Sequence, residues 1–365
     1  MRITIVLEHF SPISGGAEGM AVSVVRGLLR RGHDVQIVAR TGKPLEGCPL
    51  HLVNHGNYAE TATAVAGGGV VVDWGLRIPA DVHRLGGGPT REFREYNLLA
   101  TPPVFHWLKR LLDRLSSKMQ KKIHHEESLF RRPQDRFIAV SEFVAKQVRE
   151  NYPVGEDRMC VIHNGVDVGR FSPTNRETWR TEMRQLWGVP EDAVLFMFVA
   201  HNPRLKNFKL LARVFRRLHK EIPLARLVVV GKHRVPCMGD PWLVHAGAVA
   251  VPEKAYAAAD VLLHPTFFDA CANVVLEAMA SELPVVSSDL NGSAEMITSG
   301  HDGFVLPVHG ADSARIEREW TERVRQLAMD SELRTRIGAA ARKTAESHTM
   351  AAYIDALEAN FARRR

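Results

Sequence analysis

Short apolar runs alternate with amphipathic, helix-like stretches along the whole chain, a pattern typical of parallel β-sheets covered by helices. In the first half, strand-length runs occur at 3–7, 34–39, 50–53, 69–73, 137–140 and 159–163. A second series occurs at 194–199, 226–230, 261–264 and 284–287. Each series opens with a strand, a polar loop and a helix, so the pattern predicts an α/β protein with two Rossmann-like, doubly wound domains.

A polar, turn-rich stretch at 165–173 separates the two series, and we interpret it as the linker between the domains. We therefore predict an N-terminal domain over 1–168 and a C-terminal domain over 169–347. The last stretch, 317–365, has the pattern of consecutive helices.

Composition agrees with two domains and gives no sign of a metal or disulfide framework. The 365 residues, 45% of them hydrophobic, suffice for two packed cores. The four cysteines lack paired spacing, so we expect neither zinc nor disulfides, and a reducing cytoplasm. We expect no signal peptide, because the first strand is short, and no apolar stretch approaches the roughly 20 residues that span a bilayer.

The most informative stretch contains two carboxylates, Asp269 and Glu277, on either side of an expected helix start. Asp269 follows the apolar run at 261–264, and Glu277 falls inside a helix that begins near Ala272. A helix N-terminus attracts anions because its first N–H groups have no partners within the helix. A phosphate at this end, with a carboxylate on either side for neutral hydroxyls, suits a nucleotide-sugar.

This stretch resembles the E-x7-E element of the retaining glycosyltransferases of family 4, with aspartate in place of the first glutamate. Further segments resemble elements of that family in the same order, and they are 14–18, 31–35, 161–167, 200–207, 281–287 and 291–297. The resemblance extends over nearly the whole chain, so it is far more specific than any single motif. The N-terminal half matches less closely, as expected if it binds the acceptor.

The resemblance implies the GT-B architecture, in which two Rossmann-like domains face each other across a cleft and a final helix, about 348–365, returns to the N-terminal domain. It implies a nucleotide-sugar on the C-terminal domain and an acceptor on the N-terminal one. The chain is most similar to the lipopolysaccharide-core glucosyltransferases, which use a lipid-anchored acceptor at the cytoplasmic leaflet. We therefore expect a cytoplasmic or peripheral membrane enzyme that moves a hexose or heptose from a donor of the UDP-glucose type to a lipid-linked saccharide.

Two cations, Arg204 and Lys206, follow the expected strand at 194–199 and precede a helix that begins near Asn207. This is the usual phosphate position of such a fold. A guanidinium binds two oxygens and an ammonium supplies a compact charge, so the pair can stabilise a departing diphosphate. The alternative is that both side chains are simply solvated. The chain has no D-x-D or H-E-x-x-H element, so we expect no metal and no other cofactor.

By resemblance, Asp269 accepts hydrogen bonds from the hydroxyls of the donor sugar, and Glu277 accepts them from the ribose. Aspartate is one methylene shorter than the family's glutamate, which leaves its reach to the sugar open. The simpler alternatives are a helix cap for Asp269 and a surface position for Glu277. A glycosidase pair is not indicated, because sequence spacing does not give the spatial gap between two carboxylates. The residues between them that we assign to the donor site are Ala270, Cys271, Ala272 and Asn273.

Glycines mark two further candidate positions. Gly15 and Gly16 lie between the first strand and the first helix, where the backbone either approaches a donor phosphate or the acceptor, or simply turns. Gly231 and Lys232 follow the strand at 226–230, near the expected nucleobase.

Three titratable residues have open roles. Asp81 and His83 precede a run of three glycines, and we consider catalytic positions that face the cleft for both. A core position, satisfied by a backbone carbonyl, is the alternative for His83. Glu295 is either close to the phosphate or structural.

The segment 107–136 holds nine Lys/Arg and four Asp/Glu, a net charge of +5 against +7 for the whole chain. One interpretation is a long helix whose apolar stripe packs on its own domain. The other is a basic amphipathic helix on an anionic membrane surface, which Phe105 and Trp107 would suit. No nucleic-acid motif accompanies the charge, so we expect no nucleic acid partner. The apolar stripe consists of Leu108, Leu111, Leu112, Leu115, Met119 and Ile123.

Two rival functions are compatible with the sequence. A non-catalytic membrane-surface protein on the same fold is motivated by the aspartate at position 269 and by the basic segment. A GT-B nucleotide-sugar epimerase would bind the same donor but use no acceptor.

Overall fold

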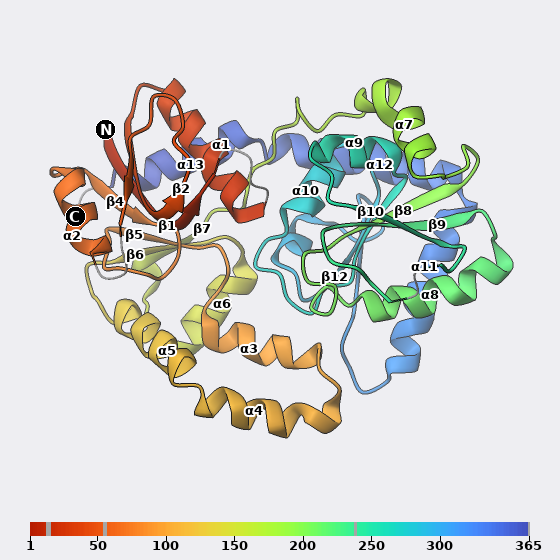
Figure 1. Cartoon of the computed structure of the whole chain (residues 1–365), viewed down its shortest axis with the longest axis horizontal. Coiled ribbons are helices and arrows are strands. Elements are labelled where there is room, and N and C mark those ends of the chain that lie inside the picture. The colour runs from red at the N-terminus through yellow and green to blue at the C-terminus, as the bar shows by residue number, and fades with distance from the viewer. Residues whose placement is uncertain (12–15, 54–56, 237–238, 364–365) are drawn as a thin grey trace. The chain divides into compact units, whose positions relative to one another are not determined.

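The computed structural model describes residues 1–11, 16–53, 57–236 and 239–363, and it divides into two compact units (Figure 1). Unit 1 comprises Met1–Glu95, Val104–Gly165 and Met350–Arg365, and unit 2 comprises Tyr96–Pro103 and Val166–Thr349. The chain therefore passes between units next to the predicted linker. The assignment of Tyr96–Pro103 to unit 2 was not indicated by the sequence pattern.

Unit 1 contains one seven-stranded parallel sheet in the order β3-β2-β1-β4-β5-β6-β7. Its strands are β1 (Arg2–Phe10), β2 (Asp34–Gly42), β3 (Leu50–Leu52), β4 (Val70–Asp73), β5 (Val82–Leu85), β6 (Arg136–Ala139) and β7 (Met159–Val161). Its helices are α1 (Gly16–Arg30), α2 (Tyr58–Ala66), α3 (Thr90–Leu99, whose end belongs to unit 2), α4 (His106–Leu115), α5 (Ser117–Phe130), α6 (Glu142–Asn151) and α13 (Met350–Phe361).

The last helix packs on the first within unit 1. Ile354 and Leu357 of α13 belong to the same buried cluster as Val24 and Leu28 of α1. A β-carbon at Gly27 would lie only 2.1 Å from Cδ1 of Ile354, so a larger residue there would require the Ile354 side chain to shift. A buried apolar face thus joins the C-terminal helix to the N-terminal fold. Arg31 and Glu358, which are 327 residues apart in sequence, also form a hydrogen bond between these two parts.

Unit 2 contains a six-stranded parallel sheet in the order β10-β9-β8-β11-β12-β13. Its strands are β8 (Val194–Val199), β9 (Ala225–Val230), β10 (Leu243–Gly247), β11 (Val261–His264), β12 (Val285–Ser288) and β13 (Phe304–Leu306). Its helices are α7 (Asn175–Leu186), α8 (Phe208–Glu221), α9 (Pro252–Ala258), α10 (Asn273–Ala280), α11 (Ser313–Met329) and α12 (Ser331–Ser347).

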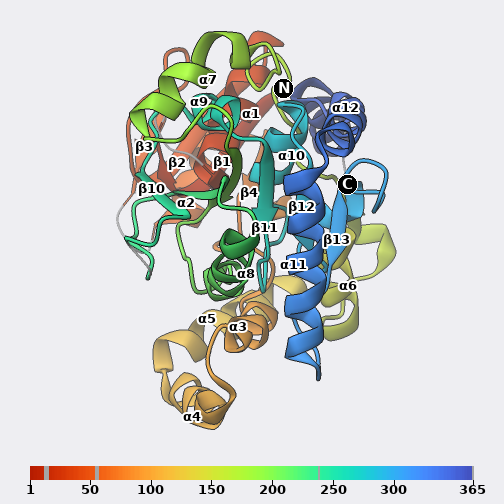
Figure 2. The ribbon, with the colours of Figure 1, turned by 90° about the vertical axis from the view of Figure 1, so that its right-hand side faces the viewer.

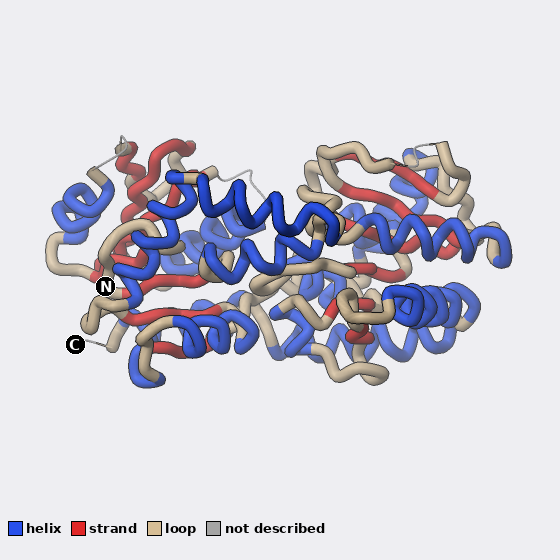
Figure 3. Tube along the Cα trace, turned by 90° about the horizontal axis from the view of Figure 1, so that it is seen from below, coloured by secondary structure: helices blue, strands red, loops and turns tan. Residues whose placement is uncertain are grey.

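Alternate residues of the central strands of unit 2 face different helices. Phe196 and Phe198 of β8 share a buried cluster with Phe215 of α8 and Trp320 of α11. Because strand side chains alternate between faces, these two helices cover one face of the sheet. Figure 2 shows α8 and α11 beside each other, and Figure 3 shows strands between helices in each unit.

The strand order reverses between β1 and β4 in unit 1, and between β8 and β11 in unit 2. Ligands of such open sheets bind outside the carboxyl ends of the strands at this switch point. In unit 2 the loops that follow β8 and β11 are the ones that contain Lys206 and Asp269. The predicted α/β class with two doubly wound domains is therefore confirmed.

The predicted long basic helix is wrong as a single element. Ser116 has extended backbone angles, φ −73° and ψ 98°, and it separates α4 from α5. Two strands of unit 2, β10 and β13, were also not predicted, because each is short and only partly buried.

Candidate active site

The candidate site of unit 2 lies where two loops meet at the switch point. The backbone N–H of Phe267 donates to the carbonyl of Leu205 at 2.9 Å, so the loop after β11 is tied to the loop after β8. Lys206 and Asp269 then follow on the two loops, and their side chains form an ion pair. The structure thus brings together two residues that are separated by 63 positions in sequence.

Asp269 has two basic neighbours. Its Oδ2 accepts from Nζ of Lys206 and lies 3.5 Å from Nε2 of His264, the last residue of β11. Burial opposes ionisation of Asp269, but the charge of Lys206 and the contact with His264 together hold its pKa well below the usual range. Asp269 is therefore a carboxylate at every pH near neutrality, and it is engaged with a cation rather than capping a helix.

The N-terminus of α10 follows directly after Asp269. Its N-cap position is Ala272, which supplies no side-chain hydrogen bond to the helix. The preceding loop is held from behind, because Asn291 accepts from the backbone N–H of Ala272 at 3.4 Å and Oγ of Ser293 donates to the Ala272 carbonyl at 3.0 Å. A rigid helix end with no side-chain cap is suited to an anion. Ala270, Cys271 and Ala272 are buried, so they shape this end through backbone rather than exposed side chains.

Glu277 lies on α10 in a separate polar cluster. Its Oε2 accepts from the Tyr256 hydroxyl at 2.6 Å, and burial raises the pKa of Glu277 despite this bond and the nearby charge of Arg170. Arg170 itself pairs with Glu253 at 2.8 Å. Glu277 is thus half-buried and oriented by a tyrosine, which differs from the freely solvated helix residue considered as the alternative.

Arg204 is exposed and lies beside the segment of α3 that belongs to unit 2. Its Nη2 donates to the carbonyl of Ala100 at 3.5 Å, a long and weak hydrogen bond. Tyr96 of the same segment contacts the ring of Phe268, with ring centroids 5.3 Å apart. Arg204 therefore has no strong anionic partner to compete with a phosphate among the described residues.

The glycine after β9 permits a close backbone contact. Gly231 has φ +155°, and a β-carbon there would lie 2.2 Å from the carbonyl oxygen of Ala200. Its N–H donates to the carbonyl of Gly247 at 2.8 Å. Gly231 thus places the β9 loop against the loop that leads to Arg204 and Lys206, while the next residue, Lys232, is exposed.

The remaining glycine and carboxylate candidates are less informative. Gly16 is the first residue of α1, and Gly15 lies outside the described residues. Glu295 is exposed in the short 3₁₀ segment Gly292–Met296 that follows the site loop.

His83 occupies the core of unit 1 rather than an open site. Its side chain is 0% exposed, with Nε2 at 2.9 Å from Asp135 and Nδ1 at 3.3 Å from Asp73. Burial opposes protonation, but the two carboxylates raise the pKa of His83 to about 8. The burial of His83 agrees with the core interpretation and not with a catalytic position, but its partners are carboxylates instead of the expected backbone carbonyl.

Asp81 has a structural role at the opposite edge of the sheet from the switch-point loops. Its Oδ2 accepts from the backbone N–H of Val71 at 2.9 Å, and its carbonyl accepts from the N–H of Arg136 at 3.2 Å. Both partners lie at the amino-terminal ends of β4 and β6. Ligands of this fold bind at the carboxyl ends, so the structure does not support a catalytic role for Asp81.

His264, Tyr256 and Arg170 were missed by the sequence reasoning. His264 had a signal, because it is a polar residue that ends an otherwise apolar strand directly before the Asp269 loop. No comparable signal marks Tyr256 and Arg170, because one bonds to Glu277 and the other acts on it through its charge, both from elements distant in sequence.

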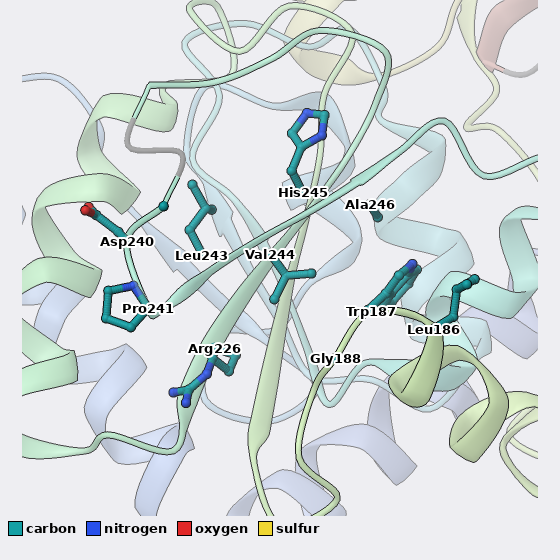
Figure 4. Close-up of a pocket in the computed structure, with 11 residues that line it drawn as sticks. Leu186, Trp187, Gly188, Arg226, Asp240, Pro241, Leu243, Val244, His245 and Ala246 are labelled. Atoms are coloured by element: carbon teal, nitrogen blue, oxygen red, sulfur yellow. The ribbon is translucent and has the colours of Figure 1, made fainter.

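A cavity of about 680 Å³ lies along the edge strand β10, away from this cluster (Figure 4). It is lined by parts of α7, the start of β9 and β10 itself, with Trp187, Arg226 and His245 among its residues. None of the switch-point residues lines it, so it is not the candidate active site.

Among residues 1–11, 16–53, 57–236 and 239–363, no cluster of three or more His, Cys, Asp or Glu is arranged to hold a metal ion. Over those ranges, no helix has the length and apolar character needed to cross a bilayer.

Comparison with known proteins agrees with the geometry. Residues 193–330 match the family model "Glycosyl transferases group 1", and residues 101–170 match "Glycosyltransferase Family 4". Across the whole chain, the structure is similar to that of WaaG, described as a glycosyltransferase involved in lipopolysaccharide biosynthesis, with a TM-score of 0.80, 17% identity, and coverage of 99% of this chain and 100% of that one. Two parts of the chain thus match glycosyltransferase group 1 and family 4 models, and the fold is that of GT-B proteins, as the resemblance predicted.

Curated relatives match at higher sequence identity than WaaG does. A D-inositol 3-phosphate glycosyltransferase of Nocardioides sp. is 27% identical over 57% of this chain and 49% of its own length. The protein of the same name from Corynebacterium diphtheriae is 25% identical over 98% of this chain and 93% of its own length. The chain spans about half the length of the first curated relatives it matches.

Proposed function

We propose that the protein is a retaining glycosyltransferase that moves a hexose or heptose from a nucleotide-sugar to a saccharide acceptor. The observation that supports this most is the convergence of Lys206, Asp269 and the uncapped end of α10 at the switch point of unit 2. A cation and a helix N-terminus suit a diphosphate, and a carboxylate beside them suits sugar hydroxyls.

Each part of the donor has a candidate partner. The diphosphate lies between Lys206, Arg204 and the first N–H groups of α10. The ribose hydroxyls donate to Glu277, whose Oε1 has no hydrogen-bond partner in the described part of the chain. The transferred sugar donates to Asp269. A donor of the UDP-glucose type is favoured by the similarity to the Anabaena HepE structure, described as a complex with UDP-glucose, at a TM-score of 0.73 and 16% identity.

The proposed chemistry needs only fixed charges. The acceptor hydroxyl oxygen forms a bond to the anomeric carbon while the bond from that carbon to the diphosphate oxygen breaks, and the hydroxyl proton passes to the departing phosphate. Lys206, Arg204 and the α10 N–H groups stabilise the negative charge of the leaving group, so we propose turnover without a divalent metal. Attack on the face that the diphosphate leaves retains the anomeric configuration.

We also propose that the acceptor is lipid-linked and that α4 contacts an anionic membrane at the cytoplasmic face. The apolar stripe of α4 does not pack on unit 1, since Trp107 is 67% and Leu115 72% exposed. The predicted stripe continues from α4 into α5, and of its six residues only Ile123 on α5 is buried. The exposed apolar residues of this surface are Val104, Phe105, Trp107, Leu108, Leu111, Leu112 and Leu115.

Basic side chains accompany the α4 surface. Arg114, Lys118 and Lys121 are exposed, and no ion pair is formed by any of the three among the described residues. An amphipathic helix with an apolar face and nearby cations adsorbs to anionic lipid. The exposed apolar residues of α4 together with these cations support membrane contact over the packed-stripe interpretation.

The decisive test of the activity is release of UDP from UDP-glucose, with and without a lipopolysaccharide-core acceptor and with EDTA present. The proposal predicts acceptor-dependent release that EDTA does not abolish, with retained configuration in the product. A free epimer formed without acceptor would instead identify an epimerase. Absence of both donor binding and turnover would leave the non-catalytic alternative.

A further inference from the structure

His264 is a buried side chain with unused hydrogen-bonding capacity. It is 1% exposed, and neither ring nitrogen has a hydrogen-bond partner within the described residues. Buried polar groups in folded proteins are almost always paired, and an unpaired one costs stability. The unpaired imidazole of His264 therefore indicates that it forms a hydrogen bond in another conformation of the candidate site.

Nε2 of His264 lies near the carboxylate of Asp269. The distance to Oδ2 is 3.5 Å, beyond the range of a good hydrogen bond. The same Oδ2 accepts from Nζ of Lys206. Two donors thus lie next to one carboxylate oxygen, and Lys206 is the one that bonds to it.

The protonation state of His264 suits a donor without charge. Burial and the ammonium of Lys206 both lower the pKa of His264, against the opposing effect of Asp269. The ring is therefore neutral near pH 7 and has one N–H, which Nε2 can hold when it faces an acceptor. A neutral donor can orient Asp269 without neutralising its charge.

We propose that His264 is a positioning residue that holds Asp269 toward the transferred sugar once Lys206 turns to the donor diphosphate. This inference rests on the proposed function. The Asp269 carboxylate competes with the diphosphate for the Lys206 ammonium, so donor binding weakens that pair. His264 then closes the 3.5 Å gap and donates to the released Oδ2, which leaves Oδ1 for the sugar hydroxyl.

A pair of matched variants tests the donor role. In His264→Gln the side-chain amide nitrogen replaces Nε2 as a donor, whereas His264→Met has a similar length and no donor. The probes are UDP, GDP and ADP and their glucose derivatives, measured by calorimetric titration, with thermal unfolding as the check of folding. The nucleoside diphosphate that the parent protein binds, and its glucose derivative, are then used for the variants.

The proposal predicts that His264→Met binds the nucleoside diphosphate like the parent but loses about tenfold or more of its affinity for the nucleotide-sugar, as for a lost hydrogen bond to a charged group. His264→Gln should regain most of that affinity. In an Asp269→Ala background, His264→Met should have no further effect on sugar affinity, because the two residues act through one contact.

The outcomes separate this inference from the proposed function. If the parent protein binds none of the probes, the donor site itself is wrong and the inference falls with it. If the parent binds them and His264→Met equals the parent, or loses diphosphate and sugar affinity alike, His264 only fills space and the inference is overturned. Equal losses in His264→Met and His264→Gln, or an additive effect with Asp269→Ala, would also overturn it.

Discussion

At the scale of single residues, Asp269 and Glu277 have different surroundings although they lie close in sequence. Asp269 is paired with a cation in the loop, and Glu277 accepts from a tyrosine on the helix. The sequence could predict that both carboxylates belong to one site, because the loop and helix pattern is local. It could not predict Tyr256 or Lys206 as their partners, since those contacts depend on how separate strands are ordered in the sheet.

The different surroundings predict different losses of function. Glu277→Ala should weaken binding of free nucleoside diphosphate and nucleotide-sugar alike, because the ribose is common to both. Asp269→Ala should spare the free nucleotide and mainly lower transfer, by roughly tenfold or more for one charge-assisted contact. Calorimetry with UDP and a transfer assay give both numbers. An equal loss of UDP affinity in the two variants would show that the roles are misassigned.

At the scale of elements, His83 joins three strands of unit 1. It lies on β5, and its two ring nitrogens face Asp73 at the end of β4 and Asp135 just before β6. Arg132 also donates to Asp135 at 2.9 Å, so the imidazolium shares that carboxylate with another cation. The sequence pattern did not predict β5, and the burial of His83 follows from the position of β5 between β4 and β6, which a local pattern does not reveal.

The raised pKa of His83 predicts a pH-dependent stability of unit 1. A folded-state pKa of about 8 against an unfolded value of 6.5 means that the native protein binds the proton more tightly. The contribution, on the order of 2 kcal/mol, is complete below pH 6.5 and is lost as the pH rises through 8.

In denaturant unfolding, the free energy of unfolding of the parent protein should decline between pH 6.5 and 9. His264→Gln is a control that leaves His83 and its two carboxylates intact, and it should show the same decline. In His83→Gln the slope over this range should be reduced. The same slope in all three proteins would show that His83 does not contribute.

In the molecule as a whole, the two Rossmann-like units and the order of the family's motifs could be predicted. Strand-length apolar runs and glycine-rich turns are local signals. The break of the basic segment at Ser116 was not, and it matters because α4 and α5 differ in burial. An apolar stripe at helical spacing looks the same whether a domain or a membrane covers it. Only the structure shows that the α4 part is left exposed.

The exposed stripe predicts binding of the full-length protein to anionic vesicles. Trp107→Ser with Leu111→Ser and Leu115→Ser should remove flotation with anionic vesicles, because it removes the apolar face. Reversal of Lys118, Lys121 and Lys122 to glutamate should also abolish it, and salt should weaken the parent's binding as the Debye length falls from about 10 Å at 0.1 M to about 3 Å at 1 M.

The control for this experiment is transfer to a soluble acceptor fragment, which both sets of changes should leave largely intact. A parent protein that does not float with anionic vesicles at low salt would end the membrane hypothesis without affecting the donor site.

Lys206 and Arg204 are the proposed ligands of the donor diphosphate, and calorimetric titration with UDP, GDP and ADP measures their contribution. Lys206→Ala should lower the affinity for whichever of these diphosphates the parent protein binds, by roughly ten- to a hundredfold. Because Arg204 is exposed, Arg204→Ala should lower that affinity less. Lys209→Ala, an exposed cation in the first turn of α8, is the matched control and should bind like the parent. Unchanged affinity in both Lys206→Ala and Arg204→Ala, with the folded state intact, would contradict the account.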